Sequence, residues 1–229
     1  MLTGICRPSG RTRHLCLAAL GALLFATAAL AQDTPPAADV AYMQPSAGVE
    51  TPTQSTFDNG SMAFMLVATS LVMLMTPGLA FFYGGLVGRK HTLTIMTQSF
   101  VSLGWTTVIW FICGFSLCFS GNMANGTDVV GLMGNLNMAF LHGVDLKTPF
   151  TGGHISMFVF VSYQMMFAII TPALITGAFA NRVRFSAYLI FLTAWLFLVY
   201  FPLVHMVWGG GLLAEQFGVL DFAGGIVVH

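Results

Sequence analysis

The residues with the clearest capacity for chemistry lie near the end of the sequence, between His205 and His229. This stretch holds two imidazoles, the indole of Trp208, three consecutive glycines and the carboxylate of Asp221, all between long apolar segments. Polar and ionisable side chains at membrane depth are costly and usually serve a function. An indole face attracts cations, and an imidazole can receive a proton. The stretch is therefore a candidate site for cation binding and proton transfer.

A second candidate is the aromatic pair Tyr163 and Phe167, which lie four residues apart in an apolar run. Side chains at this spacing stack on one face of a helix. Such a pair can bind a cation on its ring faces or exclude water from a narrow passage. Two aromatic residues at helical spacing are also common in ordinary packing, so both interpretations stay open on the residues alone.

Several residues of the first candidate site also have purely structural interpretations. Trp208, at the outer end of an apolar run, fits an interfacial anchor, and His205, one turn earlier, fits a hydrogen bond to a neighbouring helix. Asp221 directly precedes an apolar run and fits a helix cap. His229 follows eight residues later, which in a continuous helix places it about 12 Å deeper, near the middle of a hydrocarbon core about 30 Å thick.

The composition indicates a polytopic membrane protein. Apolar residues make up 56% of the 229 residues and charged residues only 7%. The formal net charge is zero, which gives nucleic-acid binding no electrostatic support. The sequence carries none of the common hydrolase, metalloprotease or phosphate-loop motifs, so we predict no enzyme and no cofactor. A metal site using His205 and His229 is disfavoured because neither has an acidic or Cys partner at depth.

The apolar runs predict an all-α protein with four membrane helices and the beginning of a fifth near Phe222. The predicted spans are 62–87, 92–119, 155–180 and 185–207. Four of the five Lys and Arg residues after position 31 lie in the short links 88–91 and 181–184. The positive-inside rule places these two links in the cytoplasm and the mature N-terminus outside. The external link 120–153 is expected to carry a short helix in its apolar middle, 129–140.

Three regions are predicted along the chain. Residues 1–31 have the basic start, apolar centre and small-residue cleavage site of a signal peptide. Residues 32–60 are rich in Pro, Ser, Thr and Gln, which predicts a disordered external tail. Residues 61–229 form the membrane domain.

Three stretches of this domain resemble the ammonium transporter family (Amt/Mep/Rh), particularly its bacterial Amt branch. They are TPGLAFFYGGLVGRK at 76–90, GAFANRVRFSA at 177–187 and HMVWGGGLLAEQFGVLDFAGGIVVH at 205–229. The resemblance implies eleven membrane helices in two inverted five-helix halves plus a final helix, assembled as a homotrimer with one pore through each subunit. The 229 residues correspond to the N-terminal half, so we expect a partial or truncated sequence that lacks the second half of the pore.

The resemblance also implies roles for individual residues. Trp208 and Phe167 match the outer site that recruits ammonium, and Tyr163 and Phe167 match the two rings of an aromatic gate. His229 matches the first of two pore histidines, and Asp221 matches the buried carboxylate that organises the outer site. Tyr163 stands where many bacterial members have Phe, so the outer ring carries a hydroxyl here.

The function implied is passage of ammonium, or of ammonia plus a separated proton, across the inner membrane of a Gram-negative-type bacterium. The mature N-terminus is then periplasmic. The partners implied are the ammonium or ammonia substrate, membrane lipid, two further copies of the chain and a cytoplasmic regulator of the PII type. The alternative is a sensor that binds ammonium without transporting it.

Overall fold

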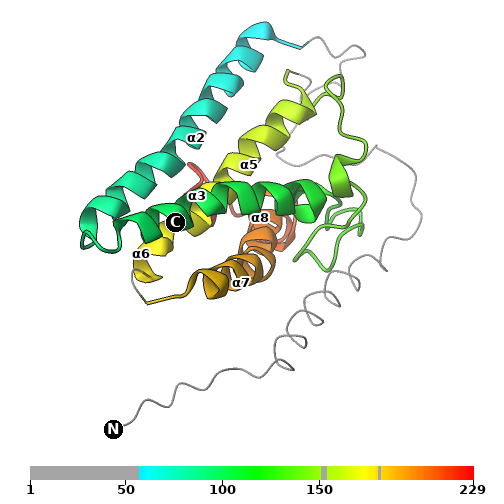
Figure 1. Ribbon diagram of the computed structural model, residues 1–229. Coiled ribbons are helices and arrows are strands. Elements are labelled where there is room, and N and C mark those ends of the chain that lie inside the picture. The colour runs from blue at the N-terminus through cyan, green and yellow to red at the C-terminus, as the bar shows by residue number, and fades with distance from the viewer. Residues whose placement is uncertain (1–56, 151–153, 180–181) are drawn as a thin grey trace. The chain divides into compact units, whose positions relative to one another are not determined.

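A computed structural model describes residues 57–150, 154–179 and 182–229, which form a series of helices (Figure 1). The predicted signal peptide and nearly all of the predicted external tail lie outside the described residues. The helices are α2 (Asn59–Leu86), α3 (Thr92–Ile109), α4 (Phe115–Phe119), α5 (Met157–Leu174), α6 (Thr176–Phe179), α7 (Phe185–Trp195), α8 (Phe201–Trp208), α9 (Leu212–Glu215) and α10 (Gly225–Val228). Two π-helical turns join them, η1 (Trp110–Gly114) between α3 and α4 and η3 (Leu196–Tyr200) between α7 and α8.

Four helical stretches of the described chain are long and apolar enough to cross a membrane. They are Asn59–Leu86, Thr92–Phe119, Met157–Phe179 and Phe185–Glu215. At 1.5 Å per residue, the 28 residues of α2 span about 42 Å, more than the hydrocarbon core of about 30 Å. The predicted fold class is confirmed, and the four predicted spans agree with these helices within a few residues at most ends.

The helices pack around an aromatic core. Helix α2 lies against α3 and α5, and α4 lies against α8 (Figure 1). The Trp110 ring, in the π turn η1, meets Phe115 at 5.9 Å and Phe201 at 6.2 Å between ring centroids. All three side chains are almost completely buried. The core therefore joins the second and fourth spans next to the candidate site.

Helix α2 exposes large apolar side chains along much of its length. Phe64 is 71% exposed, Leu71 is 60% exposed and Leu86 is 68% exposed. A helix that is apolar all round is typical of a membrane span, where lipid or other membrane helices cover such side chains. This exposure fits the membrane class that the composition predicts.

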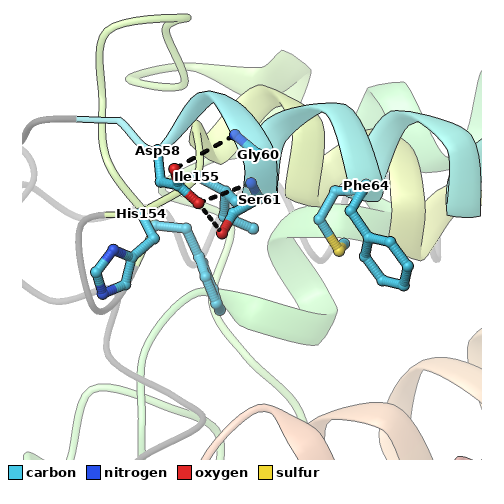
Figure 2. Close-up of a pocket in the computed structure, with 8 residues that line it drawn as sticks. Asp58, Gly60, Ser61, Phe64, His154 and Ile155 are labelled. Atoms are coloured by element: carbon cyan, nitrogen blue, oxygen red, sulfur yellow. Dashed lines mark hydrogen bonds between the residues drawn. The ribbon is translucent and has the colours of Figure 1, made fainter.

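Asp58 caps the N-terminus of α2 (Figure 2). Its carboxylate accepts hydrogen bonds from the backbone N–H groups of Gly60 and Ser61, at 3.3 and 2.8 Å, and from the Ser61 hydroxyl at 2.6 Å. The backbone N–H of Asp58 donates to the carbonyl of His154, at 3.0 Å. These residues line an open cleft of about 560 Å³ beside the helix start. The cap thus fixes both where α2 begins and how it meets the start of the third span.

The cap predicts a pH dependence of stability. The Ser61 hydroxyl, followed by the two backbone N–H groups, lowers the pKa of Asp58 below its ordinary value of 3.8. A folded pKa below the unfolded one means that the stabilisation is complete above 3.8 and is lost as the pH falls through the folded value. We therefore expect the difference in unfolding temperature between wild type and Asp58→Leu to shrink as the pH falls from 6 to 3. A difference that stays constant over this range would contradict the assignment.

The segment between α4 and α5, named the external segment here after its predicted side of the membrane, folds mainly on its own hydrogen bonds. The short helix predicted in its apolar middle is limited to a three-residue 3₁₀ turn, Ala139–Leu141. Gly131 has φ +71°, and Gly134 packs so tightly that a Cβ there would lie 2.3 Å from the carbonyl oxygen of Ser120. Asn135 holds the segment, donating to the carbonyl of Thr127 at 2.9 Å and accepting from the Ser120 hydroxyl. A continuous helix is incompatible with these glycine conformations and close contacts.

Candidate functional site

Trp208 is the last residue of α8, and its position depends on the glycines that follow it. Gly210 has φ +79°, a conformation that glycine adopts without strain. A Cβ on Gly209 would lie 2.1 Å from the carbonyl oxygen of Cys118, and one on Gly211 would lie 2.5 Å from that of Gly131. The three glycines therefore let the end of α8 contact the backbone of α4 and of the external segment directly. The Trp208 side chain is 7% exposed.

Asp221 connects this indole to the start of α10. The Trp208 indole N–H donates to Oδ2 of Asp221 at 3.1 Å, and the backbone N–H of Ile226 donates to Oδ1 at 3.4 Å. Residues 221–224 are not helical, and α10 begins at Gly225 with Gly224 as its N-cap. The helix predicted to begin near Phe222 therefore begins three residues later, and Gly224 rather than Asp221 occupies the N-cap position. The Asp221 carboxylate still accepts a first-turn N–H, because the intervening residues bend back toward the helix.

Three aromatic rings form a continuous row beside this carboxylate. Tyr163 meets Phe167 edge to face, with 5.0 Å between ring centroids and 79° between ring planes. Phe167 meets Trp208 in the same manner, at 6.4 Å and 73°. Edge-to-face contacts of this length are favourable, and the face of an aromatic ring attracts cations. The structure thus brings together Tyr163, Phe167, Trp208 and Asp221 from α5, α8 and the segment before α10.

His229 follows α10 directly, and its backbone N–H donates to the carbonyl of Gly225 at 3.0 Å. Only the four residues Gly225–Val228 of α10 precede it, a rise of about 6 Å at 1.5 Å per residue. The depth of about 12 Å below Asp221 assumed a continuous helix from Asp221, and that assumption is wrong. The structure places His229 after the site residues Trp208 and Asp221 but gives no contact between its side chain and theirs.

His205 lies one turn before Trp208 and is completely buried. Its Nδ1 lies 3.0 Å from the carbonyl oxygen of Cys118, at the end of α4, and its Nε2 lies 3.1 Å from Oδ2 of Asp128. The predicted hydrogen bond from His205 to a neighbouring helix is confirmed. No local pattern predicts the partner Asp128, which lies 77 residues away in the external segment. The sequence indicates only that Asp128 and the end of α8 lie on the same predicted side of the membrane.

Comparison with known proteins gives a consistent assignment. The sequence matches the family described as the Ammonium Transporter Family over residues 63–229. It is 45% identical over 174 residues to ammonium transporter 1 of Dictyostelium discoideum, covering 75% of this chain and 36% of that protein. It is 44% identical over 170 residues to the ammonium transporter of Bacillus subtilis, covering 74% and 40%.

Solved structures agree with these relatives. The structure is similar to the crystal structure of Candida albicans Mep2, with a TM-score of 0.65 and 35% sequence identity over 76% of this chain and 36% of that one. The chain spans 36 to 40% of the length of these relatives. The match covers most of the chain and includes every residue of the candidate site. The chain therefore belongs to the ammonium transporter family.

Proposed function

We propose that the intact protein moves ammonium, or ammonia plus a separated proton, across the membrane, and that the row of Tyr163, Phe167 and Trp208 forms the outer part of its path. The observation that carries the proposal is the hydrogen bond from the Trp208 indole to Asp221, at 3.1 Å, beside the Phe167 ring. It holds an aromatic face in one orientation within helices long enough to cross a membrane. Family membership and the names of the relatives support ammonium as the substrate.

The carboxylate of Asp221 fixes the groups around it through hydrogen bonds, in addition to placing negative charge near the cation. Each carboxylate oxygen accepts one N–H group, from the indole of Trp208 and from the backbone of Ile226. In this proposal the cation binds on the aromatic faces, because both carboxylate oxygens already accept N–H groups. Cation–π contacts contribute about 0.5–2 kcal/mol each, which permits capture from water and release further along the path.

The further elements of the proposal rest on the resemblance of the sequence to its family. His229 supplies an imidazole that receives a proton or guides the neutral species deeper in the pore. Tyr163 and Phe167 act as the gate that excludes hydrated alkali ions. The intact protein is a homotrimer of the bacterial inner membrane with a periplasmic N-terminus, and a PII-type protein binds its cytoplasmic side.

The proposal can be tested with the full-length protein that contains these residues, reconstituted in proteoliposomes. We expect uptake of radiolabelled methylammonium down its gradient, and competition by ammonium. Trp208→Leu should raise the KM for methylammonium because it removes the strongest cation–π face. A protein that binds ammonium but gives no uptake above that of empty liposomes would contradict transport and favour a sensor.

The hydroxyl of Tyr163 is expected to matter little. Among the described residues, the contact shown for this side chain is the edge-to-face contact between its ring and that of Phe167. Tyr163→Phe keeps that contact, so we expect uptake within about twofold of wild type, whereas Tyr163→Ala removes the ring and should slow uptake more. Initial rates of methylammonium uptake at saturating and low substrate would distinguish them. An effect of Tyr163→Phe as large as that of Tyr163→Ala would give the hydroxyl a direct role.

A further inference from the structure

The pair formed by His205 and Asp128 is a buried ionisable group that the proposed path does not use. The side chain of His205 is 0% exposed and that of Asp128 is 3% exposed. A titratable pair withdrawn from water to this degree must satisfy its hydrogen-bonding groups within the protein. Its hydrogen bonding can therefore be argued from what surrounds it.

Both ring nitrogens of His205 face oxygen atoms. Nδ1 lies 3.0 Å from the carbonyl oxygen of Cys118, and a carbonyl oxygen can only accept a hydrogen bond. Nε2 lies 3.1 Å from Oδ2 of Asp128, which is also only an acceptor when the carboxyl is ionised. Two arrangements satisfy every group. Either an imidazolium donates to both oxygens beside a carboxylate, or a neutral imidazole donates from Nδ1 to Cys118 and accepts at Nε2 from a protonated Asp128. In both arrangements each ring nitrogen is hydrogen-bonded and the ring is held at two points.

The pair joins three parts of the chain at the outer end of α8. His205 belongs to α8, Cys118 to α4, and Asp128 to the external segment. Two backbone hydrogen bonds run beside it, from the N–H of Met123 to the carbonyl of Gly210 at 3.1 Å and from the N–H of Leu212 to the carbonyl of Gly131 at 2.8 Å. The glycine turn that follows Trp208 is thus held against the external segment on both sides of the pair.

We propose that the hydrogen-bonded pair of His205 and Asp128 fixes the external segment to the end of α8 and thereby positions the Trp208 indole. His205 precedes Trp208 by one helical turn, so a shift of this anchor moves the indole relative to Asp221 and Phe167. His205 is a positioning residue in this proposal, because its ring nitrogens contact protein oxygens and not the path. Only its consequence for transport rests on the proposed function.

The pair can be detected in the full-length protein. We expect nitrogen-15 NMR of histidine-labelled protein to show ring-nitrogen shifts of His205, assigned with His205→Gln, that change in Asp128→Asn. The exposed His142 in the external segment provides a comparison within the same sample, and its shifts should stay the same. Unchanged His205 shifts in Asp128→Asn would overturn the pair, and this result needs no active transport.

The positioning role can be measured with Asp128→Asn. The Asn side chain is nearly isosteric and keeps a hydrogen-bonding group beside Nε2 while it removes the carboxylate, so the fold should be kept. We expect the indole N–H resonance of Trp208 to move and the KM for methylammonium to rise by about three- to tenfold, with the maximal rate little changed. The matched control is Asp145→Asn, an exposed acidic residue in the same external segment.

These outcomes separate the two proposals. An unchanged Trp208 resonance in Asp128→Asn would overturn the positioning role, whatever the transport result. A shifted resonance in a protein that shows no uptake even as wild type would support positioning while contradicting the proposed function. If Asp128→Asn does not fold, His205→Gln breaks the same pair from the other side and is expected to shift the same indole resonance.

Discussion

Replacing Asp221 with Ala in the full-length protein is expected to lower the ratio of maximal uptake rate to KM by about 10- to 100-fold. The carboxylate accepts two N–H groups, from the Trp208 indole and from the backbone of Ile226. Its removal leaves both donors without these partners, and an unsatisfied donor on a buried side chain such as the Trp208 indole costs about 1–3 kcal/mol. Trp208 is 7% exposed, so water cannot replace the lost acceptor freely. The indole should therefore lose its fixed orientation, and the start of α10 should lose a first-turn hydrogen bond.

A series at this position separates charge from geometry. Asp221→Asn keeps one oxygen acceptor but directs an amide N–H₂ group toward the second donor, so an effect between wild type and Asp221→Ala is expected. Trp208→Phe removes the donor instead, and in a double-mutant cycle with Asp221→Asn the two effects should be less than additive because they share one hydrogen bond. Asp145→Ala, in the exposed part of the external segment, is the control. Wild-type uptake by Asp221→Ala would show that Asp221 does not organise the path.

The sequence was sufficient to predict the helices, because long apolar runs and the placement of basic residues depend little on tertiary context. The links at 88–91 and 181–184 separate the spans where charged residues make continued membrane burial costly. The contact between Tyr163 and Phe167 was equally predictable, since residues four apart share a helix face. Both predictions depend on the local sequence alone.

The contacts that organise the site could not be predicted from the sequence, because they depend on how segments without regular structure fold back onto the helices. The hydrogen bond between Trp208 and Asp221 joins residues 13 apart through a turn with several glycines, so no periodicity reports it. Asp128 reaches His205 across 77 positions only because the external segment packs on α8. Residues 221–224 are not helical and bring the Asp221 carboxylate to the first turn of α10, which begins at Gly225. A continuous helix from Asp221 to His229 does not allow for this bend.

Gly209→Ala is expected to be the most destabilising small substitution at this site. The added Cβ would lie 2.1 Å from the carbonyl oxygen of Cys118, 2.7 Å from Nδ1 of His205 and 2.9 Å from the Cα of His205. These are backbone and ring atoms in buried surroundings, so the steric clash is relieved only if α4 and α8 move apart. Backbone strain is not the cause, because Gly209 has φ −91°, which Ala adopts freely. Overpacking of this kind costs about 1–3 kcal/mol or more, and the shift also lengthens the hydrogen bond from His205 to Cys118.

The matched control is Gly104→Ala, in the interior of α3, where an added Cβ meets nothing within 4 Å. Ala is a better helix former than Gly by about 0.5–1 kcal/mol, so this variant should be as stable as wild type or slightly more stable. Thermal unfolding of the detergent-solubilised protein would compare the two. Equal unfolding temperatures for Gly209→Ala and Gly104→Ala would show that α4 and α8 do not approach as closely as the glycine turn permits. A lower temperature for Gly209→Ala alone, together with a shifted Trp208 indole resonance, would tie the stability of this contact to the orientation of the site.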